Sequence, residues 1–162
     1  MAQHKTVIGW REWAALPALA VDGIKVKVDT GAQTSCLHAI HIRHLGPEQP
    51  DQIRFELHPL QRRSDITVTC VAPLVGERLI TSSTGHREYR PVIRTSISMG
   101  DQTWPIEITL TNRDSMGFRM LLGRQAMRGH LVVDAGESFL LGKRPPGPPP
   151  VRKPRNTSSD HE

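Results

Sequence analysis

An aspartate that directly follows a predicted strand is the residue of this sequence best placed to do chemistry. Apolar and lysine residues alternate over 24–28, as in a half-buried strand, and Asp29-Thr30-Gly31-Ala32 comes next. Gly31 allows a tight backbone bend, and the hydroxyls of Thr30 and of Thr34 or Ser35 can orient the carboxylate. A carboxylate held in this way can serve as a general acid or base. The same residues would also make an ordinary Asx turn at the end of a strand.

A second segment, Met120-Leu121-Leu122-Gly123-Arg124, places large apolar residues, a glycine and an arginine before a short predicted helix at 124–128. Taken with Asp29-Thr30-Gly31-Ala32, it resembles the retropepsin-like aspartic proteases. The resemblance implies that the apolar-apolar-Gly segment packs beneath a catalytic turn. Asp29, Thr30 and Gly31 would then be catalytic, and Gly123 and Arg124 would support them.

The resemblance is closer to one bacterial family, described as ATP-dependent zinc proteases and associated with RimK-type ATP-grasp glutamate ligases. It covers roughly residues 6–141 and is carried by the motifs Val28-Asp29-Thr30-Gly31-Ala32-Gln33-Thr34-Ser35, Leu37-His38-Ala39, Arg54-Phe55-Glu56-Leu57-His58-Pro59, Thr81-Ser82-Ser83-Thr84-Gly85-His86-Arg87-Glu88-Tyr89-Arg90-Pro91-Val92-Ile93 and Leu121-Leu122-Gly123-Arg124. It implies an acidic peptide substrate and a ligase as a possible partner.

The residues themselves argue only weakly for zinc or ATP. The sequence contains neither His-Glu-x-x-His nor a phosphate-binding Gly-x-x-x-x-Gly-Lys motif. His38, His41 and His44 recur every three residues near Cys36, so a helix there would put three imidazoles loosely on one face, where a zinc site is conceivable. A set of surface or core-edge histidines is the simpler interpretation. We therefore predict no metal site and no cofactor, and assign the ATP requirement to the ligase.

An aspartic protease needs two carboxylates that face one water and share a proton. This chain has one Asp-Thr-Gly, and its nearest imitation, Asp134-Ala135-Gly136, lacks the hydroxyl residue. A second copy of the chain would have to supply the other Asp29 across a two-fold axis. We therefore predict a homodimer that shares one active site.

A flap should cover that site, and residues 80–92 are the candidate because Gly85 provides a turn between apolar ends. The resemblance places the retropepsin flap in the same part of the chain. The residues predicted to contact substrate are Ala32, Ser83, Gly85, His86, Arg87 and Arg90. The cationic members favour an acidic substrate, although a solvated hairpin would look the same.

The chain departs from viral retropepsins at Gln33, where these often carry an acidic residue that pairs with the arginine of Gly-Arg. A glutamine can accept one hydrogen bond from Arg124 but cannot make a charge-assisted bidentate pair. We expect the dimer interface near Arg124 to differ accordingly.

The remaining patterns predict an all-β, retropepsin-like small closed barrel with one short C-terminal helix. Alternation predicts strands over 66–70, 93–99 and 104–110, the last two joined at Gly100-Asp101. A turn at Asp22-Gly23 should join 19–21 to 24–28, and strands at 131–133 and 139–141 should flank a turn at 135–138. Residues 35–45 are ambiguous between helix and strand.

Bulk composition sets the wider limits. The 162 residues suggest one domain, which we place at 1–142, and the proline-rich basic segment 143–162 reads as a disordered tail that holds much of the +5 charge. Cys36 and Cys70 could pair, but free buried thiols in a reducing compartment are the simpler interpretation. No apolar run has the length of a signal peptide or membrane span, so we expect a cytoplasmic protein without a membrane partner.

Three other functions stay open. The barrel could be a non-catalytic binding partner of the ligase, which predicts that Asp29→Asn leaves function intact. It could be a zinc hydrolase that uses the three histidines. An RNA-binding barrel with a basic tail is disfavoured, because three Phe, three Trp and one Tyr give few rings for base stacking, and we predict no specific nucleic-acid partner.

Overall fold

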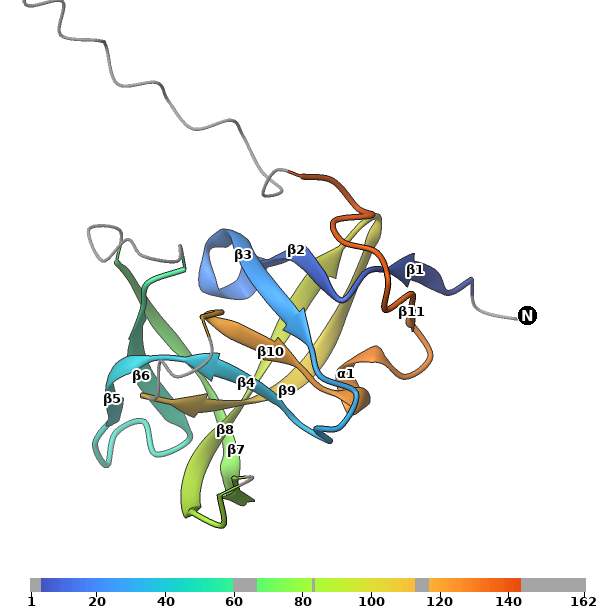
Figure 1. Ribbon diagram of the computed structural model, residues 1–162. Helices are drawn as coiled ribbons and strands as arrows, with labels where there is room; N and C mark the ends of the chain where they lie inside the picture. Colours follow the sequence, from blue (N-terminus) through green and yellow to red (C-terminus); the bar gives the residue numbers. More distant parts are fainter. Residues whose placement is uncertain (1–3, 60–66, 83, 113–116, 144–162) are drawn as a thin grey trace, which may run out of the picture.

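The computed structural model describes residues 4–59, 67–82, 84–112 and 117–143, and shows a β-barrel with one long projecting hairpin (Figure 1). Its elements are β1 (Thr6–Ile8), β2 (Arg11–Leu16), the 3-10 turn η1 (Pro17–Leu19), β3 (Val21–Val28), β4 (Ser35–His38), β5 (Ile40–His44), β6 (Gln52–Leu57), β7 (Val68–Thr81), β8 (Arg87–Met99), β9 (Gln102–Thr111), β10 (Met120–Leu122), α1 (Arg124–Met127) and β11 (Leu131–Val133).

Six strands close into the barrel in the order β2-β3-β10-β4-β9-β8, and a pairing of Ala15 with Ser98 joins β8 back to β2. Strand β10 lies between β3 and β4, parallel to the first and antiparallel to the second. Beyond β8, the sheet continues through β7, β6 and β5. The predicted all-β closed barrel with a short C-terminal helix is confirmed.

The hydrophobic core consists mainly of aliphatic side chains, and Ile24, Ile93, Ile97, Ile108 and Leu110 come from strands that alternation predicted. Burial of apolar side chains is the main force that stabilises the barrel. Aliphatic residues supply most of this burial, because the chain has few aromatic residues. The largest fully buried side chains are Phe55, Ile8, Leu16, Ile24, Leu37, Ile53, Leu57, Ile93, Ile97, Met99, Ile108 and Leu110.

A small second sheet joins the two ends of the described chain. Strand β1 pairs in parallel with β11, from Thr6 with Leu131 to Ile8 with Val133. The buried carboxylate of Glu12 accepts three backbone hydrogen bonds, from Gly9 (2.7 Å), Leu140 (2.8 Å) and Leu141 (3.1 Å). One charged side chain thereby fixes the segment after β11 against β2.

One predicted turn and one predicted strand differ in the structure. Asp22-Gly23 lies within β3, and the chain reverses earlier, at η1, where Ala20 has a positive φ of 58°. Residues 139–141 form no strand, because their backbone N–H groups bond to Arg11 and Glu12 rather than to β11. The hairpin of β8 and β9 and the helix at α1 are as predicted.

Residues 35–45 resolve into strands β4 and β5, so the helix that would have gathered three imidazoles does not form. His38 is buried on β4, whereas His41 and His44 are exposed on β5. Within the described ranges, no three His, Cys, Asp or Glu side chains are grouped as metal ligands would be. No helix in these ranges is both long and apolar enough to cross a bilayer.

Candidate active site

Asp29 begins the loop that joins β3 to β4, and the loop is held by backbone hydrogen bonds on both sides. The Asp29 N–H donates to the Leu122 carbonyl (2.9 Å), and the Gly31 N–H donates to Asp29 Oδ1 (3.0 Å). The Ala32 N–H closes the turn onto the Asp29 carbonyl (3.2 Å). The half-buried carboxylate is therefore fixed through its own backbone and through one of its oxygens.

Strand β10 and the start of α1 support this loop from beneath. The Gly123 N–H donates to Ser35 Oγ (3.0 Å), and the first N–H groups of α1, from Arg124 and Gln125, donate to the carbonyls of Ala32 and Gln33. A Cβ on Gly123 would lie 2.6 Å from the Thr34 carbonyl carbon and 2.9 Å from the Ser35 nitrogen. A φ of −89° suits any residue, so backbone conformation does not require glycine at position 123. Glycine is required because the backbone of Thr34 and Ser35 lies too close for a Cβ.

Gly123→Ala should therefore destabilise the protein by about 3 kcal/mol, because every atom that the methyl group meets belongs to the backbone. Urea unfolding would measure the loss, and the midpoint should fall without a change in slope. Gly46→Ala is the matched control, since its Cβ meets nothing within 4 Å and should change stability by less than about 0.5 kcal/mol. Equal stability of the two variants would contradict the proposed close packing.

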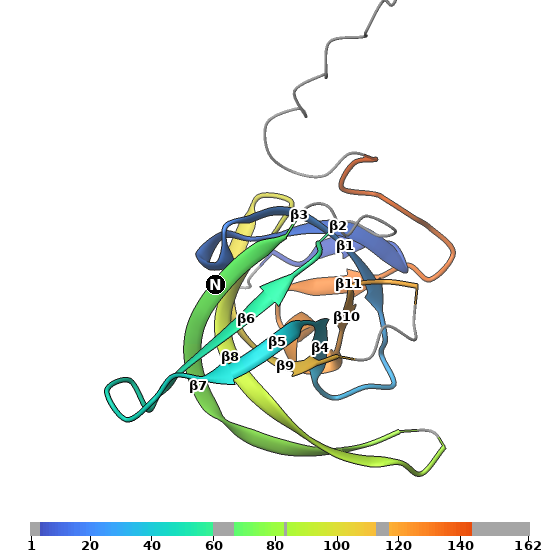
Figure 2. The same ribbon diagram turned by 90° about the vertical axis from the view of Figure 1, so that its left-hand side faces the viewer.

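The loop and the β7–β8 hairpin line a common cavity of about 600 Å³, which we call the Asp29 cavity. Figure 2 shows the hairpin curving around the barrel and extending past the β3–β4 loop. The loop contributes Asp29, Gly31, Ala32, Gln33 and Thr34, and the hairpin contributes Arg78, Leu79, Ile80, Thr81, Ser82 and Arg90; the remaining lining residues are Cys36, Thr109, Thr111 and Leu121.

The site thus combines a carboxylate on a tight Asp-Thr-Gly turn, the apolar strand β10 followed by Gly123, and a long hairpin that lines the same cavity. A family model described as RimB-like, the retropepsin-like aspartic endopeptidase RimB, matches residues 7–144. The chain belongs to this family.

Curated relatives carry a different name. A "probable alpha-L-glutamate ligase" of Shewanella pealeana is 49% identical over 144 residues, which are 89% of this chain and 31% of that protein. A protein of the same name from Desulfotalea psychrophila is 42% identical over 139 residues, 86% of this chain and 30% of that protein. The chain thus spans about a third of the length of these relatives.

A crystal structure of a Legionella pneumophila protein of unknown function has the same fold. The TM-score is 0.70 at 26% sequence identity, and the match covers 85% of this chain and 99% of the other. The similarity therefore extends over nearly the whole of that chain.

The hairpin lies in the part of the chain that the family resemblance assigned to a flap, and Gly85, near its tip, has a positive φ of 82°. Of the predicted substrate-contacting residues, Ala32 and Arg90 line the Asp29 cavity. Gly85, His86 and Arg87 are exposed near the tip and lie outside its lining, and Ser83 lies outside the described residues.

Arg124 does not bond to the Gln33 side chain as the sequence suggested it could. Its Nη1 donates instead to the Thr30 carbonyl (3.0 Å). Thr30, Gln33 and Arg124 line a different cavity of about 460 Å³ together with Lys5 and residues of α1 and β11. Arg124 thus holds the loop through the backbone of Thr30 rather than through the side chain of Gln33.

Arg78 and Cys36 are among the cavity residues that the sequence did not assign to the site. Arg78 Nη1 donates to Thr34 Oγ1 (2.5 Å), which joins the hairpin to the loop of Asp29. Arg78 stands directly opposite Arg90 in the β7–β8 register. The predicted flap starts at Ile80; continuing its strand pairing two residues further back would have placed Arg78 opposite Arg90.

Cys36 and Cys70 are both free and buried, as the sequence suggested. Burial raises the pKa of the Cys36 thiol, although the nearby Arg90 guanidinium partly opposes the rise. Burial also raises the pKa of Cys70, to about 11. Both thiols are therefore protonated at neutral pH, which argues against either as a nucleophile.

Proposed function

We propose that the protein is an aspartic peptidase whose active site is shared by two copies of the chain. The observation that carries the proposal is the position of Asp29, on a tight turn supported by β10 and facing a cavity beneath the β7–β8 hairpin. A rigid strand end with a covering hairpin is what acid–base catalysis on a peptide requires.

One Asp29 can ionise and activate a water, and the second, protonated, can donate to the scissile carbonyl. Two carboxylates close together hold one proton between them because both cannot ionise at low cost. Within the described residues, Asp29 is the one acidic residue that lines the cavity, so the second carboxylate must come from a partner chain. A two-fold axis beside the loop would supply it.

We propose acidic peptides as substrates, with the protein acting beside a glutamate ligase. The ligase name of the longer relatives supports this, because a region similar to this chain forms part of the same polypeptide there. A peptidase and a ligase with opposite effects on glutamate-rich chains would form a reversible pair. The two free buried thiols fit a reducing compartment, and we place the reaction in the cytoplasm.

Subunit mixing tests the shared site. Glutamate-rich peptides are incubated between pH 4 and 8 with wild-type protein that has been exchanged with a ninefold excess of Asp29→Asn chains. If every site needs two aspartates, activity per wild-type chain should fall roughly tenfold, because about one partner in ten is then wild type. Mixing with excess wild-type chains is the control.

Unchanged activity per wild-type chain would exclude a shared site. Activity that is lost with a chelator, rather than with a pepstatin-like inhibitor, would favour a metal hydrolase. Binding of the ligase by a chain that cleaves nothing would favour the non-catalytic barrel.

A further inference from the structure

Two arginines face each other across the hairpin that covers Asp29. Arg78 on β7 and Arg90 on β8 are direct partners in the antiparallel register, and both line the Asp29 cavity. Side chains at such positions lie close together on one face of the sheet, and like charges placed there destabilise it. The pairing of Arg78 with Arg90 therefore lowers the stability of the hairpin, which indicates that the pair has a role other than stabilising the fold.

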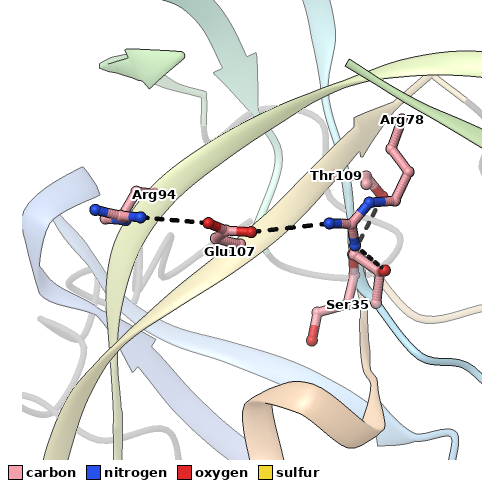
Figure 3. Close-up of polar contacts among 6 residues, drawn as sticks. Ser35, Arg78, Arg94, Glu107 and Thr109 are labelled. Carbon is pink, nitrogen blue, oxygen red and sulfur yellow. Dashed lines mark hydrogen bonds and ion pairs between the residues drawn. The ribbon is translucent and has the colours of Figure 1, made fainter. Parts of the chain in front are cut away.

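The hairpin and barrel offset this repulsion only in part. Arg90 Nε donates to Glu88 Oε2 (3.1 Å), and its Nη1 to Cys36 Sγ (3.4 Å). Arg78 lies 3.9 Å from Glu107 Oε2, at the limit of an ion pair, and Glu107 is shared with Arg94 on its other side (3.3 Å, Figure 3). Each guanidinium has five N–H donors, and these contacts use few of them.

The exposure of the two side chains suits them to a ligand. The Arg90 side chain is 14% exposed, so its charge is largely withdrawn from bulk water, whereas the Arg78 side chain is 36% exposed. A charge-assisted hydrogen bond to a partly desolvated guanidinium is stronger than one in open water. The acidic residue that lines the cavity beside them is Asp29, which the proposed reaction already occupies.

We infer that Arg78 and Arg90 form the subsite that selects substrates, by binding the side-chain carboxylate of an acidic residue next to the scissile bond. The inference rests on the proposed peptidase function and adds to it the residues that give specificity. The cavity faces of β7 and β8 would hold the carboxylate between two guanidiniums, and the Arg78–Thr34 hydrogen bond would place it at a fixed distance from the Asp29 loop.

Arg87, which is exposed near the tip of the hairpin, is the residue to compare with the cavity pair Arg78 and Arg90. It lies on the same hairpin, three residues from Arg90, and outside the lining of the cavity. General attraction of an acidic peptide to a basic hairpin would depend on Arg87 as much as on the cavity pair. A built subsite would depend on Arg78 and Arg90 alone.

Binding to a non-hydrolysing protein separates this inference from the reaction. Full-length Asp29→Asn protein is titrated into a fluorescein-labelled glutamate-rich peptide and into its glutamine counterpart, with fluorescence anisotropy as the readout. We expect a preference for the glutamate peptide that falls roughly tenfold or more with either Arg78→Gln or Arg90→Gln. Arg87→Gln should leave the preference nearly unchanged, and circular dichroism would establish that each variant is folded.

Equal losses in all three arginine variants would overturn the inference in favour of general charge attraction, as would a preference that survives both cavity variants. Hydrolysis by the wild-type chain is measured separately. If the glutamate preference depends on the pair but no peptide is cleaved, the subsite stands and the peptidase proposal fails. If cleavage requires Asp29 but KM ignores Arg78 and Arg90, the subsite fails and the peptidase stands.

Discussion

Asp29→Asn should abolish peptide hydrolysis, with a fall in kcat of roughly 10³-fold or more, and leave the fold intact. Asparagine keeps a side-chain oxygen that can accept the Gly31 N–H, so the turn should survive. It cannot take a proton from water or share one with a partner carboxylate, and acid–base catalysis of this kind contributes about 10²–10⁴-fold. Steady-state cleavage of glutamate-rich peptides, with thermal unfolding in parallel, measures both effects.

Asp134→Asn is the matched control, because the chain repeats the same local geometry there. The Gly136 N–H donates to Asp134 Oδ1 (3.2 Å), as the Gly31 N–H does to Asp29 Oδ1 (3.0 Å). Asp134 is exposed and does not line the Asp29 cavity. Its substitution should leave kcat unchanged. Cleavage that survives in Asp29→Asn would exclude the aspartic mechanism.

Glu12→Ala should cause the largest loss of stability, about 4 kcal/mol or more. The fully buried carboxylate accepts hydrogen bonds from Gly9, Leu140 and Leu141, and its removal leaves these backbone donors unpaired. Hydrogen bonds to charged groups contribute about 1.5–3 kcal/mol each, and buried donors without partners carry a further cost. Because whole domains are stable by only about 5–15 kcal/mol, much of the fold's margin would be lost.

Chemical unfolding of the purified variants would measure this loss. Glu137→Ala removes an exposed glutamate from the segment that Glu12 fixes and should change stability by less than about 0.5 kcal/mol. Glu12→Gln keeps one acceptor oxygen and should fall between the two. A Glu12→Ala protein as stable as Glu137→Ala would show that the three hydrogen bonds contribute little.

Local patterns of residues were enough to predict much of the barrel and the centre of the site. Period-two alternation located β3, β8 and β9, Gly100-Asp101 located their hairpin, and Asp29-Thr30-Gly31 marked the turn above β10. These features depend on interactions between residues a few positions apart, so they can be predicted from local sequence patterns. The same reasoning failed at Asp22-Gly23, which lies within β3 at an irregularity in its pairing with β2, between the Val21–Leu16 and Ile24–Ala14 pairs.

Contacts between distant segments were decided by the tertiary structure alone. In the sequence, Glu12 cannot be distinguished from other glutamates in strands. Its role depends on hydrogen bonds from the N–H groups of Leu140 and Leu141, which are more than a hundred residues away in the chain. Arg78 lines the cavity only because the folded hairpin reaches the loop of Asp29, where Arg78 bonds to Thr34. The sequence by itself therefore determined which residue could do chemistry and which elements would carry it. The folded structure decided which charges line the cavity beside that residue, because burial and contacts between remote segments arise only when the whole sheet has formed.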